Sequence, residues 1–373
     1  MDLSLPLMAN NIDRTDIDCL IDFLKQDSIP RLTNGPKVVE FEEKWSKWLG
    51  VKHSVFVNSG TAANELSMLA LTHLYPDGGE IIVPPLTWIS DINSVLFANF
   101  EPVFVDINKN NLSFDLDKLE NSITDKTRAI FVTHVLGINA LSNRLLKICE
   151  ERDIKLIEDV CESHGAEFNN AKLGSIGFAS NFSFYFAHHK DLIKKYNDKY
   201  DNLNPDFIFI GKAHNFRSTE INAVLGICQL DKLDSNNHIR IDNFQYFMDN
   251  LSSDIYHTDI EMSGQCNYAF IVILKNPNWE LRDKIEGVLD DNKIEFRRGL
   301  SGGGNQMRQP YFENHNFNFD DFSVVEHIHN FSWYIGHYFF EKNKPAAFSN
   351  PIKAKLSDWI MFKDILLGRL KIW

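Results

Sequence analysis

Two adjacent histidines after an aromatic stretch are the first residues of this chain that could do chemistry. The segment S-N-F-S-F-Y-F-A-H-H-K runs from Ser180 to Lys190, and its alternating phenylalanines predict a strand that leads to His188 and His189. An imidazole titrates near neutral pH, so it can accept or release a proton during a reaction. A histidine pair after a strand is more often structural than catalytic, so its meaning depends on what precedes it.

A second candidate site is V-N-S-G-T-A-A-N-E, residues 57–65, where an apolar run leads through Ser59, Gly60 and Thr61 into a helix. Glycine lets the backbone approach a ligand, and Thr61 is expected to cap the helix. The free amides and the helix dipole could then hold a phosphate. An ordinary strand-to-helix turn has the same pattern, and this stretch alone does not separate the two.

Two further residues could hold a planar, positively charged ring. Trp88 follows a strand and two prolines, where its indole could lie against such a ring or simply fill space. Asp159 ends an apolar strand, at the sheet edge where α/β folds bind ligands. A buried carboxylate needs a cation or a donor, and a protonated pyridine nitrogen would supply one.

The elements around these residues alternate as in a layered α/β domain. Thr15 is expected to cap a first helix, with Asp18 as its capping-box acid, and a second helix should run from Pro36 to Gly50. The run 129–132 is apolar on both faces, as buried parallel strands are. Similar short apolar runs, each followed by a helical pattern or a turn, lie at residues 54–59, 80–85, 102–107 and 155–159.

The pattern changes after a helix predicted at residues 218–230. A smaller unit follows, with a predicted strand at 269–274, a helix at 278–290 and the glycine-rich S-G-G-G-N at 301–305. We therefore predict two domains. Residues 1–230 would form a large cofactor-binding domain with an N-terminal arm, and residues 231–373 a small C-terminal domain.

Composition excludes several other classes. With 373 residues, 44% hydrophobic and 24% charged, the chain is typical of globular proteins. Its net charge of −13 argues against a nucleic-acid or anionic-membrane surface. The five cysteines form no C-x-x-C pair, so we expect no metal site, and the chain has no signal-peptide pattern or membrane-length apolar run. We expect a soluble cytoplasmic protein.

Five motifs follow one another along the chain: S-G-T-A-A-N-E, P-P-L-T-W, E-D-V-C-E-S-H-G-A, S-F-Y-F-A-H-H and H-N-F-R-S-T-E-I-N-A-V-L-G. In this order they resemble the pyridoxal-phosphate sugar aminotransferases of the DegT/DnrJ/EryC1/StrS family. In that family the cofactor lysine follows the S-F-Y strand, and His188 stands at the matching position. This substitution resembles the sugar 3-dehydratase branch, which acts on substrates such as GDP-4-keto-6-deoxy-D-mannose. Residues 295–311 and 334–336 also resemble that branch.

The resemblance implies a fold-type I PLP-dependent aminotransferase fold: a large, mostly parallel sheet domain and a smaller α+β domain. It also implies pyridoxal 5'-phosphate or pyridoxamine 5'-phosphate as cofactor and a homodimer with shared active sites. The implied cofactor contacts are Ser59, Gly60, Thr61 and Ser183 on the phosphate, Trp88 on the ring, Asp159 on the ring nitrogen, Glu162 near the ring hydroxyl, and Asn215 reaching the neighbouring subunit's phosphate. The implied substrate-binding residues are His214, Arg217, Arg298 and Arg308, with Lys212 and Arg297 as further cations, although an arginine is ordinarily a surface residue.

The implied reaction removes the hydroxyl at C3 of a nucleotide-linked 4-keto-6-deoxyhexose, as in dideoxysugar and lipopolysaccharide O-antigen biosynthesis. His188 would be the catalytic base, and glutamate would recharge the cofactor. The nucleotide would be GDP or CDP, and the lack of clustered cysteines favours GDP, because some CDP-sugar relatives use an iron–sulfur centre.

Two other interpretations remain open. One is an aminotransferase that uses Lys190 in place of the family lysine. The other is an inactive cofactor-binding paralogue, or a partner subunit of an active enzyme. This last interpretation arises because the family's G-E-G-G turn and following strand are missing between His188 and His214.

Overall fold

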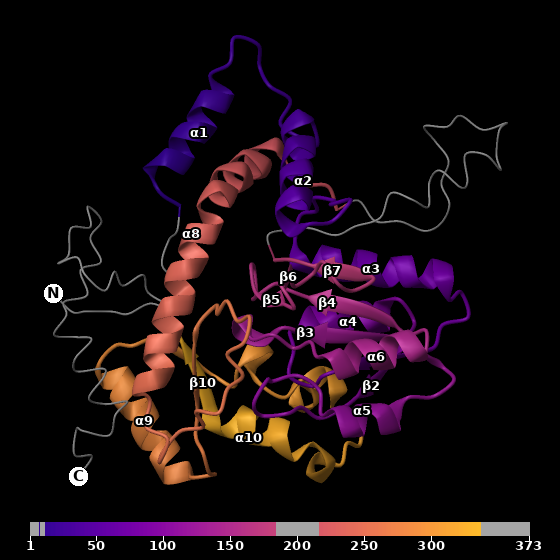
Figure 1. Cartoon of the computed structure of the whole chain (residues 1–373), viewed down its shortest axis with the longest axis vertical. Helices are drawn as coiled ribbons and strands as arrows, with labels where there is room; N and C mark the ends of the chain where they lie inside the picture. The colour runs from indigo at the N-terminus through magenta and orange to yellow at the C-terminus, as the bar shows by residue number, and fades with distance from the viewer. Residues whose placement is uncertain (1–6, 8–11, 184–215, 337–373) are drawn as a thin grey trace.

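A five-stranded parallel sheet forms the centre of the larger part of the molecule (Figure 1). The computed structural model describes residues 7, 12–183 and 216–336. The strand order is β2 (Glu101–Phe104), β1 (Glu80–Val83), β3 (Thr127–Thr133), β4 (Lys155–Asp159) and β7 (Ala179–Asn181), and each neighbouring pair is parallel. The predicted α/β fold with a mostly parallel sheet is therefore confirmed.

Helices cover both faces of this sheet, which explains why the run 129–132 is apolar throughout. Ala129 and Phe131 face a core shared with helices α3 (Gly60–Leu74) and α4 (Ile89–Phe97). Ile130 and Val132 face the opposite core, shared with helices on the other side of the sheet. These are α2 (Pro36–Leu49), α5 (Leu116–Ser122) and α6 (Asn143–Glu151).

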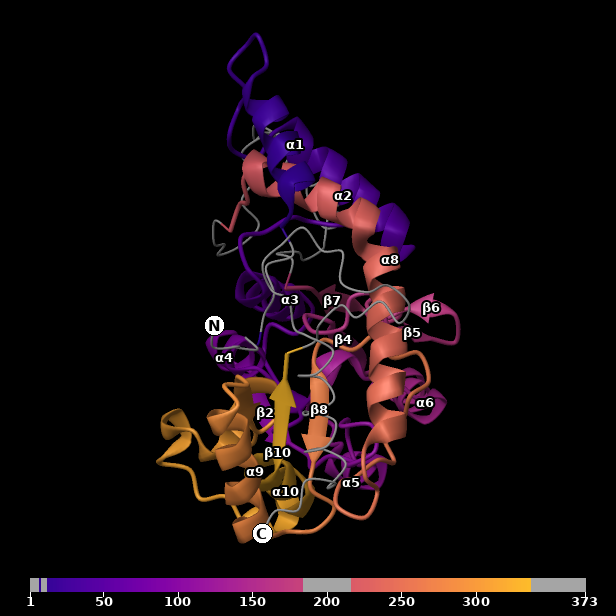
Figure 2. The ribbon, with the colours of Figure 1, turned by 90° about the vertical axis from the view of Figure 1, so that its left-hand side faces the viewer.

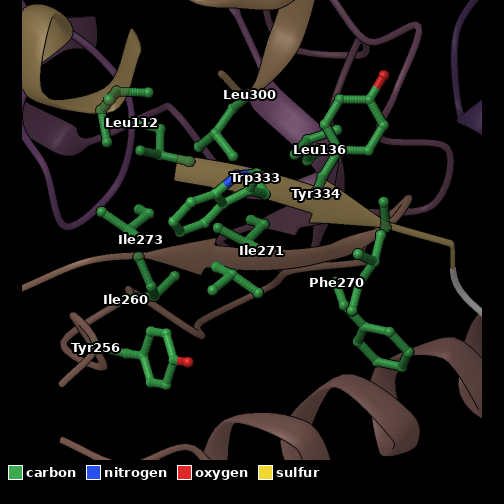
Figure 3. Packing of buried hydrophobic residues seen from close by; sticks show 14 of the residues in the cluster. Leu112, Leu136, Tyr256, Ile260, Phe270, Ile271, Ile273, Leu300, Trp333 and Tyr334 are labelled. Carbon is green, nitrogen blue, oxygen red and sulfur yellow. The ribbon is translucent and has the colours of Figure 1, made fainter. Parts of the chain in front are cut away.

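A three-stranded antiparallel sheet with the order β8-β10-β9 forms the smaller unit. Figure 3 shows its core, in which Trp333 and Phe270 pack with leucine and isoleucine side chains. The elements of this unit are β8 (Phe270–Ile273), β9 (Phe296–Arg298), β10 (Ser332–Ile335), α9 (Trp279–Asp291) and α10 (Ser323–Phe331).

One long helix, α8 (Glu220–Asn250), connects the two units. It begins beside α2 and ends in the core of the small unit, where Phe244 and Phe247 are buried (Figure 2). The helix passes through residue 230 without a break, so the two units share it. None of the helices in the described ranges has the length and apolar character needed to cross a membrane.

Some local expectations differ from the structure. Asp13, not Thr15, caps helix α1 (Arg14–Leu24), and Asp16, not Asp18, completes the capping box. The expected strand at residues 54–59 is present as an antiparallel bridge from Val57 to Arg217 rather than as a strand of the large sheet. The remaining elements are the hairpin strands β5 (Glu167–Phe168) and β6 (Ala171–Lys172), and the 3-10 turns η1 (Val135–Gly137), η3 (Ser301–Gly303), η4 (Gln306–Arg308), η5 (Pro310–Phe312) and η6 (Phe319–Phe322).

The glutamate of the H-N-F-R-S-T-E motif caps a helix that lies far away in the sequence. Glu220 is buried at the start of α8 and accepts hydrogen bonds from the amides of Gly35 (2.8 Å), Lys37 (2.9 Å) and Val38 (2.8 Å). These amides belong to the N-cap residue and the first turn of α2, where the helix supplies no acceptors for them. The motif therefore ties α2 to α8.

Replacing Glu220 with alanine should lower the free energy of unfolding by about 2 kcal/mol, because buried amides lose their acceptor. Urea unfolding followed by circular dichroism measures this change. Glu43→Ala, on the exposed side of α2, is the control and should shift the midpoint little. Equal midpoints for the two variants would contradict the capping role.

Candidate active site

The carboxyl ends of the parallel strands bring several predicted residues together. Asp159 ends β4, and the sheet register places Thr133 of β3 and Asn181 of β7 on either side of it. The start of α3 lies against the same edge, because a Cβ added at Gly60 would be 3.2 Å from the Cys161 sulfur and 3.5 Å from the Ser183 Cα. The helix start, the end of β4 and Ser183 therefore form one edge of a site.

Ser59 is the N-cap of α3, which corrects the expectation that Thr61 caps it. The Ser59 hydroxyl accepts a hydrogen bond from the Ala62 amide at 3.1 Å. The amides of Gly60 and Thr61, in the first turn, have no acceptor within the helix. With the helix dipole, this turn is suited to an anion such as a phosphate.

Asp159 and Trp88 have contrasting environments. Asp159 is only 3% exposed, and its Oδ1 accepts a hydrogen bond from the Cys161 amide at 2.8 Å. Burial and the nearby Asp159 raise the pKa of the Cys161 thiol well above its usual value, so this cysteine stays a neutral thiol. Trp88 immediately precedes α4 and is 45% exposed, although Leu86 and Thr87 are fully buried. Its indole therefore has an open surface on which a planar ring could lie.

Glu162 lies at the junction between the large unit and the glycine-rich segment. Its Oε2 accepts a hydrogen bond from the Leu136 amide at 2.8 Å, and its Oε1 accepts one from the Ser301 hydroxyl at 3.2 Å. Burial, reinforced by the charge of Asp159, raises the pKa of Glu162 to about 7. This carboxyl can therefore gain or lose a proton near neutral pH.

The glycine-rich segment packs directly on the P-P-L-T-W motif. Gly302 has φ +61°, and a Cβ there would lie 2.1 Å from the Thr87 carbonyl oxygen, so only glycine fits. The Gln306 amide donates to the Pro85 carbonyl at 2.9 Å, and Asn305 forms a bridge with Leu86. This contact joins segments far apart in the sequence, so the motifs alone did not predict it, and it brings Ser301 to Glu162.

The raised pKa of Glu162 predicts a pH effect on stability. The folded chain holds this proton up to about pH 7, whereas the unfolded chain releases it near 4.5. The folded state therefore binds more protons in this window, and its free energy of unfolding should fall as the pH rises from 4.5 to 7. Glu162→Gln should remove this decrease in the free energy of unfolding. The decrease is at most about 3 kcal/mol, and solvent screening makes it smaller because the side chain is only partly buried.

Urea titrations of the wild type and Glu162→Gln at about pH 5 and pH 8 measure the difference. Glu313→Gln changes an exposed glutamate and is the control, which should follow the wild type at both values. An identical pH dependence in all three proteins would contradict the assignment.

The arginines predicted to bind the substrate contact different side chains. Arg297 donates to the Tyr334 hydroxyl at 3.2 Å. Burial raises the pKa of Tyr334. The charge of Glu162 adds to this rise and Arg297 counteracts it, so these three side chains lie close to one another. Arg298 and Arg308 form ion pairs with Glu286 and Glu326, respectively, in the small unit. Arg217 is exposed and lies beside Val57, close to the start of α3.

Other predicted residues lie outside the described part of the chain. The proposed base His188 is one of them. The others are His189, Lys190, Lys212, His214 and Asn215. The roles given to them remain predictions from the sequence.

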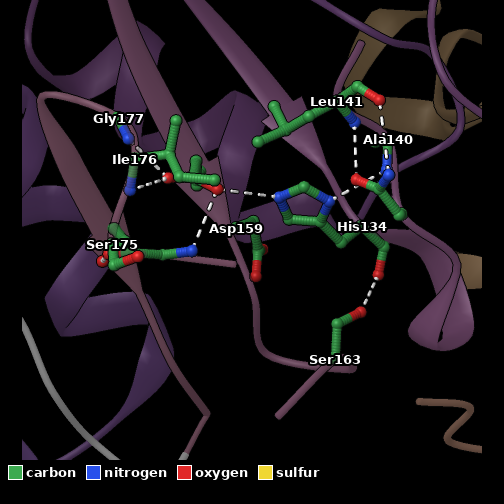
Figure 4. A network of polar contacts seen from close by, with 12 residues as sticks. His134, Ala140, Leu141, Asp159, Ser163, Ser175, Ile176 and Gly177 are labelled. Atoms are coloured by element: carbon green, nitrogen blue, oxygen red, sulfur yellow. Dashed lines mark hydrogen bonds and ion pairs between the residues drawn. The ribbon is translucent and has the colours of Figure 1, made fainter. Parts of the chain in front are cut away.

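A buried network behind Asp159 fixes the end of β4 (Figure 4). His134 Nδ1 accepts from the Ala140 amide at 3.1 Å, so its Nε2 donates to Glu158 at 3.2 Å. Burial would raise the pKa of Glu158, but His134 and the amides of Gly174 and Gly177 outweigh it and lower the pKa. The His134 amide also donates to the Asp159 carbonyl at 3.0 Å, so the network holds the backbone of Asp159 in place.

A second buried polar group, which was not predicted from the sequence, lies on the other side of Asp159. Asp91 of α4 accepts hydrogen bonds from Asn64 Nδ2 (2.6 Å), from Thr133 Oγ1 (3.1 Å) and from Thr87 Oγ1. The signal was present in the spacing, because Asp91 lies four residues before the buried Val95 and therefore on the apolar face of its helix. A carboxylate on a buried helix face needs partners, and these three supply them.

Comparison with known proteins identifies the family. The model of the DegT/DnrJ/EryC1/StrS aminotransferase family matches residues 11–190 and 192–338. The chain belongs to this family. A second model, of the 2-hydroxy-palmitic acid dioxygenase Mpo1-like family, matches only residues 322–370, a short span that lies mostly outside the described residues and carries no argument.

Several relatives of this DegT/DnrJ/EryC1/StrS family member are named as one enzyme. The chain is 27% identical to the GDP-4-keto-6-deoxy-D-mannose 3-dehydratase of Yersinia pseudotuberculosis, with 94% of this chain and 97% of that protein covered. It is 30% identical to the enzyme of the same name from Escherichia coli O55:H7, with 72% and 79% covered. The solved structure of the E. coli GDP-4-keto-6-deoxy-D-mannose-3-dehydratase with bound hydrated PLP has a TM-score of 0.81 at 24% identity, covering 98% of this chain and 100% of that one, and shows the same fold.

Proposed function

We propose that this protein is a pyridoxal phosphate-dependent 3-dehydratase that deoxygenates C3 of a nucleotide-linked 4-keto-6-deoxyhexose. It would act in deoxysugar biosynthesis, such as that of lipopolysaccharide O-antigens. One observation carries the proposal. Asp159 and Glu162 lie at the end of β4 beside the start of α3 and Ser183, in a chain that matches named 3-dehydratases over nearly its whole length.

The described residues fit pyridoxal or pyridoxamine phosphate. The missing Cβ of Gly60 leaves room beside Cys161 and Ser183, where the first turn of α3 and the Ser183 hydroxyl would hold the phosphate. Trp88 would lie against the ring, and the buried Asp159 would pair with the ring nitrogen. When bound, the aminated cofactor would supply a conjugated system that carries an electron pair from its own methylene carbon to the sugar, so that the C3 hydroxyl can leave.

Each chain residue has a separate task in the proposed reaction. Asp159 keeps a proton on the ring nitrogen through its negative charge. Glu162, with its pKa of about 7, holds or releases a proton near the ring hydroxyl. His188 moves the proton that accompanies loss of the C3 hydroxyl, and it leaves the cofactor untethered because imidazole forms no stable covalent link of the kind that lysine forms.

The full chain should be incubated with pyridoxamine phosphate, glutamate and GDP-4-keto-6-deoxy-D-mannose, and the product mass measured. We expect a 3-deoxy product and consumption of glutamate. A 4-amino sugar would instead support an aminotransferase, and neither product at any enzyme level would overturn the proposal in favour of a binding or partner subunit. A CDP-linked 4-keto-6-deoxyhexose in a parallel reaction distinguishes the nucleotides.

We also propose that the protein is a homodimer and acts in the cytoplasm. All five cysteines are free, which agrees with a reducing compartment. Large apolar side chains are exposed at and beside α4, among them Trp88, Ile89 and Phe97, which is 72% exposed. Such a patch next to the site suits a second copy of the chain, which would supply Asn215 to it.

Phe97→Asp should raise the dimer dissociation constant at least about 30-fold, because a charge would be buried at the interface. Sedimentation analysis over a concentration series measures this. Trp279→Asp changes an exposed aromatic residue of the small unit and is the control, which should leave the oligomeric state unchanged. A monomeric wild type, or a Phe97→Asp variant that dimerises like the wild type, would contradict the proposed interface.

A further inference from the structure

Two buried carboxyl groups meet beneath the proposed ring site. Asp91 is 1% exposed and Asp159 is 3% exposed. Thr133 connects them, because it lies beside Asp159 in the sheet and its hydroxyl contacts Asp91. Besides burial, the charge of Asp159 raises the pKa of Asp91, so the two side chains are close neighbours. Two ionised carboxylates side by side in a buried site repel each other, so the pair is most stable with a proton on one member.

The surroundings favour Asp91 as the protonated member. Its described partners are the neutral groups of Asn64, Thr87 and Thr133, and it forms no ion pair in the part of the chain that the structure describes. Hydrogen bonds from Thr87 and Thr133 favour the charged form of Asp91, but these hydroxyls bring no positive charge. Burial, and then the charge of Asp159, raise the pKa of Asp91 well above its usual value.

The other titratable groups near the pair do not alter this assignment. Cys161 faces both carboxyls from the end of β4, and Tyr311 faces Asp91 from η5. Burial raises the pKa of both, so both stay neutral. Glu162 faces Asp159 and adds negative charge when ionised. A second full charge on Asp91 would therefore be opposed by the charge of Asp159, and none of these neighbouring groups carries a positive charge that would offset it.

We propose that Asp91 holds a proton and donates it in a hydrogen bond to the Asp159 carboxylate, and so acts as a positioning residue for the cofactor's ring nitrogen. The pair then has one negative charge, which one protonated ring nitrogen balances. This inference depends on the proposed function only in assigning the cofactor to Asp159.

The network around Asp91 gives the pair a fixed position relative to the proposed phosphate site. Asn64 is a buried residue of α3, the helix whose first turn would hold the phosphate. Its amide donates to Asp91 at 2.6 Å and to Ser90 at 3.0 Å. Asp91 therefore links α3 to the carboxylate that would hold the ring nitrogen, so both ends of the cofactor would be located by one buried network.

Infrared spectroscopy of the full chain without added cofactor or sugar tests the proton directly. Glu162→Gln serves as the background, because Glu162 itself would be partly protonated at about pH 7. In this background we expect a carbonyl stretching band from a protonated, buried carboxyl group at about pH 7, and its loss when Asp91→Asn is added. Asp106→Asn is the control, because Asp106 is equally buried but ion-paired with Lys118; the band should persist in it. A band that persists after Asp91→Asn is added, or that is absent from the Glu162→Gln background, would overturn the proposal.

Binding of pyridoxal phosphate tests the positioning role. Asp91→Leu removes the donor and should raise the Kd at least about tenfold, as expected for a lost hydrogen bond to a charged group. Asp91→Asn keeps a donor and should bind within about threefold of the wild type. In the holoprotein made with nitrogen-15-labelled cofactor, the NMR chemical shift of the ring nitrogen reports its protonation. We expect a protonated ring nitrogen in the wild type and in Asp91→Asn, and less protonation in Asp91→Leu.

Equal affinity and equal ring protonation in Asp91→Leu and the wild type would overturn the role. If Asp91→Leu fails to fold, Thr133→Val replaces it, because this variant keeps the side-chain shape and removes one hydroxyl from Asp91. Thr133→Val should weaken cofactor binding about threefold. Cofactor affinity equal to that of the wild type in Thr133→Val would overturn the proposal. None of these measurements uses sugar turnover. Failure of the dehydration assay alone would therefore count against the proposed reaction and not against the carboxyl pair.

Discussion

Replacing Asp159 with asparagine should raise the Kd for pyridoxal phosphate at least about 100-fold. The side chain is almost fully buried at the end of β4, so the carboxylate would meet the ring nitrogen with little screening by water. Removing one partner of a buried ion pair costs about 3–5 kcal/mol, which corresponds to a factor of roughly 100 to several thousand in affinity. Asparagine keeps the oxygen that accepts from the Cys161 amide, so the local backbone has no reason to change.

Equilibrium dialysis or an absorbance titration of the full chain gives this Kd. Asp106→Asn removes the charge of another buried aspartate, which pairs with Lys118 away from the proposed cofactor contacts, and should bind the cofactor like the wild type. Cofactor affinity in Asp159→Asn within about threefold of the wild type would show that Asp159 does not hold the ring nitrogen. The whole assignment of the site would then be wrong.

Replacing His188 with asparagine should lower the rate of 3-deoxy product formation by about 100-fold to 10,000-fold, the range typical for loss of a general base. Asparagine cannot accept a proton near neutral pH. Cofactor affinity should stay within about threefold of the wild type, because Asp159, Trp88 and the start of α3 would supply the binding. The measurement is single-turnover product formation with saturating cofactor, together with the cofactor Kd.

Lys190→Ala is the matched control for this experiment. It should retain product formation if His188 is the base, and it should lose activity if Lys190 carries the cofactor instead. Borohydride reduction of the wild type followed by peptide mass analysis gives an independent answer. A reduced adduct on Lys190, or full activity in His188→Asn, would favour the aminotransferase over the dehydratase.

Contacts between the two units connect these predictions. Ser301 donates to Glu162, and Gly302 packs on the carbonyl of Thr87, the residue before Trp88. Thr87 also donates to Asp91. The glycine-rich segment of the small unit therefore contacts both the carboxyl group with a pKa of about 7 and the residues that hold the carboxyl pair. Changes in this segment should alter cofactor binding although it lies far away in the sequence.

The sequence by itself determined the layered fold and most residues at the end of the sheet. The run 129–132 is apolar on both faces, which already required a sheet covered by helices on two sides. Pro36 and Gly50 marked the ends of α2, because proline suits a helix start and glycine the left-handed residue after a helix end. Asp159 could be placed at the sheet edge because the apolar run of its strand stops there.

Tertiary structure decided which of these residues meet and which neighbours they have. Hydrophobic periodicity reports the buried face of an element but not the element that covers it. The partners of Asp91, on the inner face of α4, could therefore not be named from the sequence. The structure shows that the sheet places Thr133 and Asp159 beside it. The same reason applies to Ser301 and Glu162, and to Glu220 and the start of α2, since each pair joins segments far apart in the chain. Residue type supplied the chemistry of this protein, and only packing between distant segments supplied the partners that set its charges.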